Sequence, residues 1–379
     1  MAHGNALTDG LLIGCYRYVP GDCTGIYRVL PPIEPLWGGT LGRVVGGTRP
    51  VWSPDRTRFA YLTNDVIWIA EPDGNRRGGS IGLPLDGSPG ALCWSRDGHY
   101  VLYTWVLYET QTTRYGIGRV AADTIGQRNW EGGETLLLPE GQGARWPAVS
   151  PDGRRLAWCG IAHDGASQTE ATAICWIPWE DLRWGGGAGT PPPMRKETIS
   201  RIPDVDAYRH QGPHWSPDSM RIGFDAEDMH TGLRTAWVAD LVADSVDEIT
   251  IGAHGTRSTS ARVSVFFLGW LGDDDCLVGS GGFLPSKAYR VLLSEGSSSR
   301  IANAGTAIWD VAIAPDRKRV AFIAGGTSSP PGTRHVTSLN TDVLVYDVQT
   351  EELETVVSNG DLTEGDIRDR PLVPYCLAW

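Results

Sequence analysis

Histidine is the residue type in this sequence with the clearest potential for chemistry. Five of the eight histidines lie in or beside segments that we expect to form loops on one side of the fold. Neutral imidazoles are common ligands for divalent metals, and an imidazole can also act as a base near pH 7. Carboxylates of Asp164, Glu227 or Asp228 could complete such a site. The predicted metal ligands are His163, His210, His230 and His335, and the predicted catalytic residues are His210, His163 and Asp228.

The fifth of these histidines, His214, has a different expected role. It adjoins Trp215, a residue that we expect in the core, and we interpret it as a buried structural histidine. His210 precedes it by four residues, a spacing that relates two side chains differently on a strand than on a helix. A shared ligand direction therefore does not follow from the spacing.

Arginine and aromatic side chains define a second candidate site. They cluster in the segments that lead into the expected inner strands, close to the axis of the fold. Arginine binds carboxylates or phosphates through two parallel hydrogen bonds, and tryptophan stacks on rings or apolar groups. The predicted ligand-binding residues are Arg49, Tyr108, Arg145, Trp146, Trp309, Asp310 and Arg370. In the alternative interpretation, Trp146 and Trp309 fill gaps between packed sheets, as most of the 16 tryptophans must.

Three other motifs are weaker evidence for a functional site. Residues 78–82 match the GxSxG pattern of hydrolase nucleophiles, but that motif needs a strand-to-helix turn that this sequence does not predict. The run Asp273 to Asp275 lacks the ligand spacing of a calcium loop, and we interpret it as a solvated turn. The glycines of 185–189 precede prolines rather than a Lys-Ser/Thr pair, which excludes a phosphate-binding loop.

The elements that must position these residues follow from an internal repeat. A short apolar strand, a turn based on Ser-Pro-Asp and a second apolar strand recur six times, with copies that begin at Pro50, Ala91, Pro147, Pro213, Phe267 and Asp310. In the turn, Pro fixes φ, Asp bonds to nearby backbone, and Gly can take a left-handed conformation. Four tryptophans share one repeat position and are predicted to lie in the core: Trp52, Trp94, Trp215 and Trp270.

Further strands complete each repeat. A third strand is predicted at 66–70, 115–120, 173–178, 235–241, 288–293 and 342–348, and a weaker fourth strand at 134–139, 247–251 and 353–357. Four antiparallel strands that recur in this way are typical of the blades of a β-propeller. The insertion of residues 179–196 is rich in Gly and Pro and is expected to be an irregular loop.

The two ends of the chain are predicted to form one more blade. Segments 11–17 and 25–29 resemble second and third strands, 35–41 an outer strand, and 374–379 a first strand with nothing after it. Pairing them would leave no open sheet edge in the ring. The prediction is an all-β, seven-bladed propeller that occupies 1–379 as a single domain, closed by a blade from 11–45 plus 372–379. The alternative is six blades with disordered termini.

The WSPDG-type signature resembles the repeat of TolB-type propellers, which is also found in the propellers of prolyl-oligopeptidase-like peptidases and of oligogalacturonate lyases. The resemblance covers about 11–379. It implies the propeller fold, and the lyases imply a histidine-lined metal site. Because this sequence departs from TolB at its start, we expect neither the secretion signal and N-terminal α/β domain of TolB nor the hydrolase domain of the peptidases. One such scaffold hosts many activities.

Composition limits the partners. The chain has 379 residues, with 45 acidic and 33 basic side chains and a net charge of −12, so nucleic acid is an unexpected partner. No apolar stretch approaches the roughly 20 residues of a membrane span, and the start lacks the basic region of a signal peptide. Seven dispersed cysteines encode no local disulfide or zinc pattern. We expect a cytoplasmic protein, and the presence of only three lysines is typical of GC-rich, actinobacterial coding.

Two functions remain open at this stage. The first is a propeller that binds a small molecule or a protein segment at the loop-rich mouth of its central channel. The second is an enzyme that uses the same mouth, either a lyase or a cyclase/isomerase of a specialised metabolic pathway. A histidine would supply its acid/base chemistry, and a divalent metal is the one possible cofactor. A purely structural hub would instead have a closed mouth without a pocket.

Overall fold

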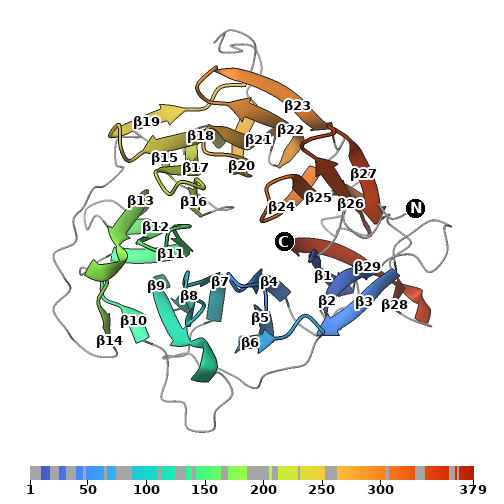
Figure 1. Ribbon diagram of the computed structural model, residues 1–379, viewed down its shortest axis with the longest axis horizontal. Helices are drawn as coiled ribbons and strands as arrows, with labels where there is room; N and C mark the ends of the chain where they lie inside the picture. The colour runs from blue at the N-terminus through green and yellow to red at the C-terminus, as the bar shows by residue number, and fades with distance from the viewer. Residues whose placement is uncertain are drawn as a thin grey trace.

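The computed structural model is a ring of small antiparallel sheets around a central axis (Figure 1). It describes residues 10–17, 25–30, 40–45, 48–63, 66–73, 88–108, 113–124, 134–138, 142–163, 170–185, 205–206, 212–228, 231–251, 263–282, 284–303, 307–328, 338–357, 363–364 and 367–379. Seven sheets follow one another around the ring, so the prediction of an all-β, seven-bladed propeller is confirmed.

Blades are numbered along the chain. Blade 1 contains β4 (Thr48–Trp52), β5 (Phe59–Thr63) and β6 (Val66–Ala70). Blade 2 contains β7 (Ser88–Trp94), β8 (Tyr100–Tyr108), β9 (Thr113–Ala121) and β10 (Glu134–Leu136). Blade 3 contains β11 (Gln142–Val149), β12 (Arg155–His163) and β13 (Glu170–Pro178).

Blade 4 contains β15 (Val205–Asp206), β16 (His214–Trp215), β17 (Arg221–Asp228), β18 (Leu233–Asp240) and β19 (Ser245–Glu248). Blade 5 contains β20 (Ser264–Trp270), β21 (Asp275–Gly281), β22 (Pro285–Leu292) and β23 (Ser297–Asn303). Blade 6 contains β24 (Ala307–Ile313), β25 (Arg319–Ser328), β26 (Ser338–Asp347) and β27 (Leu353–Val357). Blade 7 contains β29 (Ile367–Ala378), β1 (Leu12–Arg17), β2 (Gly25–Leu30), β3 (Thr40–Val45) and the short β28 (Thr363–Glu364).

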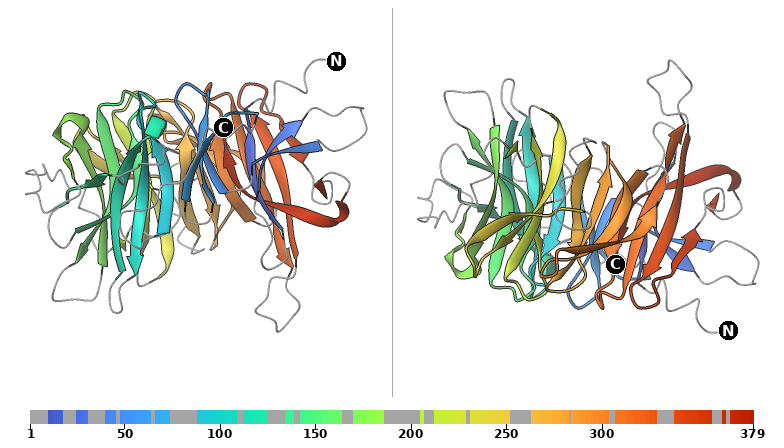
Figure 2. Two further views of the ribbon diagram at one scale, coloured as in Figure 1. Left: turned by 90° about the horizontal axis from the view of Figure 1, so that it is seen from below. Right: turned by 90° about the horizontal axis from the view of Figure 1, so that it is seen from above.

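The strands run along the ring axis, so each blade has one end at either face (Figure 2). We call the face with the Ser-Pro-Asp turns the corner end, and the face where the first strands begin the mouth end. Helical structure among the described residues is limited to two short 3₁₀ turns, Ala122–Thr124 and Trp179–Asp181. None of the described helices is long and apolar enough to cross a membrane.

The turns at the corner end have the predicted chemistry. The Ser53 hydroxyl donates to Asp55 Oδ1 at 2.6 Å, and the same carboxylate oxygen accepts the backbone N–H of Thr57 at 3.1 Å. Gly98 takes a φ of 71° in the next turn, while Arg56 takes a φ of 61° at the equivalent position of the first. The left-handed conformation therefore belongs to the turn, with or without glycine.

Repeated contacts join neighbouring blades. The indole N–H of Trp94 donates to the backbone carbonyl of Val51 in the preceding blade at 2.9 Å. The indole N–H of Trp270 donates in the same way to the backbone carbonyl of His214, also at 2.9 Å. Trp94, Trp215 and Trp270 are buried and Trp52 is half-buried, which confirms the prediction that these residues belong to the core. Hydrophobic clusters fill the space between adjacent blades, so the ring is one continuous structure.

The ends of the chain close the ring. β29 pairs antiparallel with β1, with Leu12 opposite Ala378 and Ile13 opposite Leu377. Trp379 occupies the position of the core tryptophans in the seventh copy of the repeat; it is 8% exposed, and the Arg319 guanidinium lies 4.9 Å from its ring. The predicted pairing of the two ends is therefore confirmed. The outer strand of this blade is β3, which starts later than the predicted 35–41 segment.

One segment differs from its prediction. Part of the insertion at 179–196, expected to be an irregular loop, forms a strand, β14 (Trp184–Gly185), which pairs with β10 at the outer edge of blade 2. The Arg119 guanidinium lies between the rings of Tyr100 and Trp184, at 4.5 and 4.6 Å. These contacts between distant segments outweigh the local preference of a Gly-rich sequence for irregular structure.

Candidate functional site

Bulges in the first strands distinguish the mouth end. In six blades the pairing of the first strand with the second shifts register: in β4, β7, β11, β20, β24 and β29. Arg49 and Trp146 lie at equivalent bulge positions, and each has a φ of 51°, a left-handed conformation that is uncommon for residues other than glycine. Bulges of this kind redirect side chains, here on the strands nearest the axis (Figure 1).

Trp309 and Asp310 lie at the bulge of β24. Trp309 is 40% exposed, unlike the buried tryptophans of the core, and its indole N–H donates to the carbonyl of Gly325 at 3.2 Å. The half-buried Asp310 carboxylate accepts the backbone N–H of Leu377 in blade 7 at 2.7 Å. Loss of hydration raises the pKa of Asp310 to about 6, although the hydrogen bonds from Leu377 and Val311 oppose this shift.

Arg145 and Trp146 make contacts within the protein. The Arg145 guanidinium lies 3.2 Å from the centre of the Tyr115 ring, and its buried Nε has no partner among the described residues. The backbone N–H of Trp146 donates to the Thr104 hydroxyl at 3.0 Å. Side-chain atoms of Trp146 lie so close to Gly212 that a Cβ there would approach the Trp146 Cβ to 2.4 Å. Both residues therefore serve the contact between blades.

Asp225 is a mouth-end residue that the sequence did not reveal. Its carboxylate on β17 accepts the backbone N–H of Phe267 at the bulge of β20, and its second oxygen has no partner within the described part of the chain. It is 6% exposed, and burial raises its pKa to about 7 even though Phe267 and Arg234 oppose the shift. The available signal was the repeat, because Asp225 and Thr104 both lie nine residues after the serine of their turn.

A buried arginine lies beside Asp225. Arg234 is 4% exposed, its Nε donates to Glu227 Oε2 at 3.2 Å, and its backbone N–H donates to the Ser264 hydroxyl. Its Nη1 is buried without a partner among the described residues. The blade 4–5 interface thus holds a carboxylate and a guanidinium that are both incompletely paired at the mouth end.

Several predicted residues lie wholly or partly outside the described residues. His163, Tyr108, Asp228 and Arg370 are on β12, β8, β17 and β29, but their side chains are not described. His210, His230 and His335 are outside the described segments altogether. No group of three or more His, Cys, Asp or Glu side chains that could hold a metal occurs among the described residues. The metal site and the catalytic trio therefore stay predictions.

His214 is placed as a structural residue. Its ring packs 5.6 Å from that of Phe267, and burial lowers its pKa to about 4. The imidazole is therefore neutral at physiological pH and belongs to the packing between blades 4 and 5, as predicted, although its buried Nε2 has no hydrogen-bond partner among the described residues.

The chain was compared with protein-family models, curated proteins and solved structures. No protein-family model and no curated protein matches the chain. Among solved structures, the Mycobacterium tuberculosis puromycin-hydrolyzing peptidase is 15% identical with a TM-score of 0.55, over 94% of this chain and 55% of that one. Prolyl oligopeptidase B from Galerina marginata is 13% identical with a TM-score of 0.56, over 93% and 50%.

The ring is also similar to the putative TolB from Agrobacterium tumefaciens, at 15% identity and a TM-score of 0.44 over 84% of this chain and 85% of that one. The chain spans about half the length of the two peptidases. At such identities the similarity to the peptidases establishes the propeller fold alone.

Proposed function

We propose that this propeller is a binding module whose ligand contacts the mouth end of the inner strands. One observation carries the proposal: Arg49 and Trp146 both have a φ of 51° at equivalent bulges. Such conformations cost roughly 1–3 kcal/mol each, and outside tight turns they cluster at active sites and ligand clamps. A glycine would remove the strain, so the side chains at these positions have a use that offsets it.

Two exposed side chains indicate the class of ligand. Arg49 is exposed on β4 and can pair with an anionic group, while the exposed part of Trp309 on β24 can stack on an apolar ring. Both strands contact β29, so the two residues belong to the strands on either side of the first strand of blade 7. The ligand is accordingly a small molecule or a protein segment in which an anionic group adjoins a flat apolar group.

The anionic aromatic probe 8-anilinonaphthalene-1-sulfonate tests this proposal in a fluorescence titration. We expect saturable binding to the wild type, weakened at least about fivefold by Trp309→Ala and by Arg49→Gln. Arg300→Gln, which removes an exposed arginine from the outer strand β23, is the matched control and should leave the affinity unchanged. Equal affinities for wild type, Trp309→Ala and Arg49→Gln would overturn the proposal.

The enzyme hypothesis depends on His163, His210 and Asp228. Elemental analysis of the purified protein tests its metal-assisted form, with the His163→Ala and His210→Ala variants as controls for the ligands. A cytoplasmic location also stays a prediction.

A further inference from the structure

Asp310 is the only charged residue of β24, and it directly follows Trp309 at the bulge. It lies four residues before the turn residue Ala314, as Arg49 lies four residues before Ser53 of blade 1. Ala314 and Ser53 make the same turn bond, because the N–H of each donates to the carbonyl five residues later at 2.9 Å. Asp310 and Arg49 therefore occupy the same repeat position, at the same level of the ring.

The Asp310 carboxylate points from blade 6 toward blade 7. Its Oδ2 accepts the backbone N–H of Leu377 on β29 at 2.7 Å. β29 contacts both β24 and β4, so this strand separates the strand of Trp309 from the strand of Arg49 (Figure 1). Asp310 is half-buried, so part of the residue is in contact with solvent. A ligand that contacts both Trp309 and Arg49 has to cross the strand to which Asp310 is bonded.

Backbone groups and apolar side chains surround Asp310 in the described part of the chain. Its hydrogen bonds come from the N–H groups of Leu377 and Val311, and Ile323 lies opposite it on β25. β20, which also packs against β24, has no charged residue. The position is therefore poor in groups that could compensate a negative charge.

Other strands around β24 do carry charged or titratable residues. Within the described ranges, those on the strands packed against β24 and in the apolar cluster between blades 6 and 7 are Cys15, Tyr27, Lys287, Tyr289, Arg290 and Arg319. β29 also carries charged residues whose side chains are not described: Arg368, Asp369 and Arg370. Arg290 bonds to Asp275 at 2.8 Å, and the Arg319 guanidinium lies over the ring of Trp379. Neither arginine therefore pairs with Asp310.

Burial sets the charge of Asp310. Loss of hydration raises its pKa to about 6, although the two backbone hydrogen bonds oppose this shift. The carboxyl group is therefore mostly neutral at pH 5 and mostly ionised at pH 8. An ionised carboxylate at the level of Arg49 would repel an anionic ligand and attract the guanidinium that the ligand needs.

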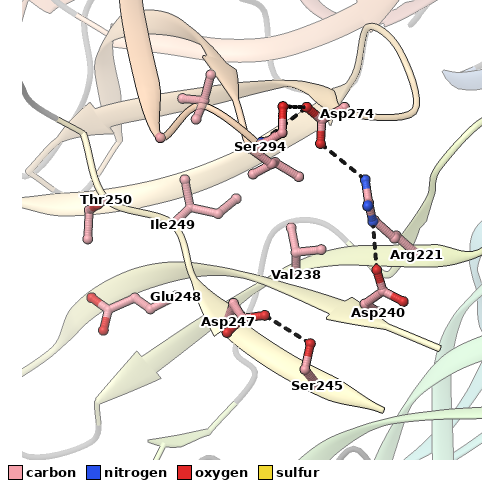
Figure 3. Close-up of a pocket in the computed structure, with 13 residues that line it drawn as sticks. Arg221, Val238, Asp240, Ser245, Asp247, Glu248, Ile249, Thr250, Asp274 and Ser294 are labelled. Carbon is pink, nitrogen blue, oxygen red and sulfur yellow. Dashed lines mark hydrogen bonds and ion pairs between the residues drawn. The ribbon is translucent and has the colours of Figure 1, made fainter. Parts of the chain in front are cut away.

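Carboxylates elsewhere in the ring are held in the charged form. Beside the cavity between blades 4 and 5, Arg221 bonds to Asp240 at 2.9 Å and to Asp274 at 3.4 Å (Figure 3). Hydrogen bonds from Ala243 and Arg221 lower the pKa of Asp240, and those from Ser294 lower the pKa of Asp274. These two carboxylates therefore stay ionised between pH 5 and 8.

We propose that Asp310 makes binding at the mouth end pH-dependent: an anionic ligand binds tightly while Asp310 is protonated and more weakly once Asp310 is ionised. This inference rests on the proposed function, because it assigns a regulator to the site of Arg49 and Trp309. Since proton and ligand binding are linked, the ligand in turn favours protonation of Asp310. Such a site collects its ligand at mildly acidic pH and releases it as the pH rises.

Fluorescence titrations with 8-anilinonaphthalene-1-sulfonate at pH 5, 6, 7 and 8 test this proposal. The sulfonate stays ionised over this range, so the change in pH acts on the protein. We expect the wild type to bind the probe at least about threefold more weakly at pH 8 than at pH 5. Asp310→Asn keeps an acceptor for the Leu377 N–H and should bind at pH 8 as tightly as at pH 5. Wild-type pH dependence in this variant would contradict the proposal.

Two control variants separate Asp310 from other carboxyl groups. Glu354→Gln removes an exposed carboxylate from β27, the outer strand of the same blade, and tests the effect of net charge. Asp225→Asn removes the other described carboxyl group that titrates in this range, at the interface of blades 4 and 5. Both variants should keep the wild-type pH dependence. Its loss in Asp225→Asn but not in Asp310→Asn would assign the effect to Asp225 and overturn the proposal.

Calorimetric titration of the wild type at pH 6, in two buffers of different ionisation enthalpy, measures the protons taken up with the probe. We expect net proton uptake; its absence would overturn the proposal even if Asp310→Asn failed to fold. Binding that Trp309→Ala weakens but that does not vary with pH would leave the proposed function intact and refute only the role of Asp310. No saturable binding at any pH would overturn both.

Discussion

At the corner end of the ring, Ser53, Ser95, Ser150 and Ser216 accept the same backbone hydrogen bond from the residue five positions later. At the mouth end the contacts between blades vary. The acceptor for the next inner strand is a hydroxyl from Thr104 in blade 2, whereas Asp225 supplies a carboxylate in blade 4. The same serine hydrogen bond therefore recurs in four turns at the corner end, whereas the side chain that accepts the hydrogen bond at the mouth end differs between blades.

This difference separates the residues that fold the ring from those that could recognise the proposed ligand. The uniform serine turns recur in blades 1 to 4 because these blades meet the same geometric requirement. The residues that join the blades at the mouth end vary although their structural role is the same, which indicates that these positions have a second role besides packing. Binding residues concentrate at the loops and strand ends on one face of a rigid scaffold.

Removal of residues 374–379 should have the largest effect. It deletes the part of β29 that pairs with Leu12 and Ile13, together with the buried Leu377 and Trp379. The loss of two large buried side chains alone exceeds about 4 kcal/mol. We expect loss of cooperative thermal unfolding, measured by calorimetry. A truncated protein that unfolds cooperatively at the wild-type temperature would show that blade 7 does not seal the ring.

Two tryptophans provide a direct comparison between core and mouth. Trp270 is 3% exposed, and Trp270→Ala should lower the free energy of unfolding by about 3–5 kcal/mol because it leaves a cavity between blades. Trp309 is 40% exposed, so Trp309→Ala should change it by less than about 1 kcal/mol. Urea denaturation measures both values. Equal losses would mean that Trp309 belongs to the core.

Asp225→Asn should change the pH dependence of stability. Because the folded-state pKa of Asp225 is raised from its usual 3.8 to about 7, the unfolded chain releases this proton at lower pH, and wild-type stability falls between about pH 4 and 7. The shift corresponds to at most about 4 kcal/mol. The variant keeps an acceptor for the Phe267 N–H but cannot ionise, so it should be the more stable protein at pH 8 and similar to the wild type at pH 4.

Urea denaturation of both proteins at pH 4, 6 and 8 tests this expectation. A constant difference between wild type and variant would show that Asp225 is ionised throughout, paired with Arg234.

The smallest expected effect on stability comes from Arg49→Gly. Glycine adopts the φ of 51° without steric cost, although it also gains freedom in the unfolded chain, so we expect a change within about 1 kcal/mol in either direction. Affinity for 8-anilinonaphthalene-1-sulfonate should nevertheless fall as much as in Arg49→Gln. A glycine variant that retains wild-type affinity would remove Arg49 from the site.

The sequence predicted the blades and the closure of the ring better than it predicted the individual residues of the mouth end. Ser-Pro-Asp turns and core tryptophans have local signatures, so the blades, the ring closure and the buried Trp270 followed from them. The pairing of β14 with blade 2 depends on contacts between segments far apart and had no local signature. Asp225 lies inside an apolar strand sequence, and its role depends on the register with β20 in the next blade.

The most direct test of the mouth site is ¹⁹F NMR of the protein labelled with 5-fluorotryptophan. The resonances missing in Trp309→Ala and in Trp270→Ala identify the two residues. On titration with 8-anilinonaphthalene-1-sulfonate, the Trp309 resonance should shift and saturate while the Trp270 resonance stays in place. A stationary Trp309 resonance under saturating probe would contradict the assignment of the ligand to the mouth end.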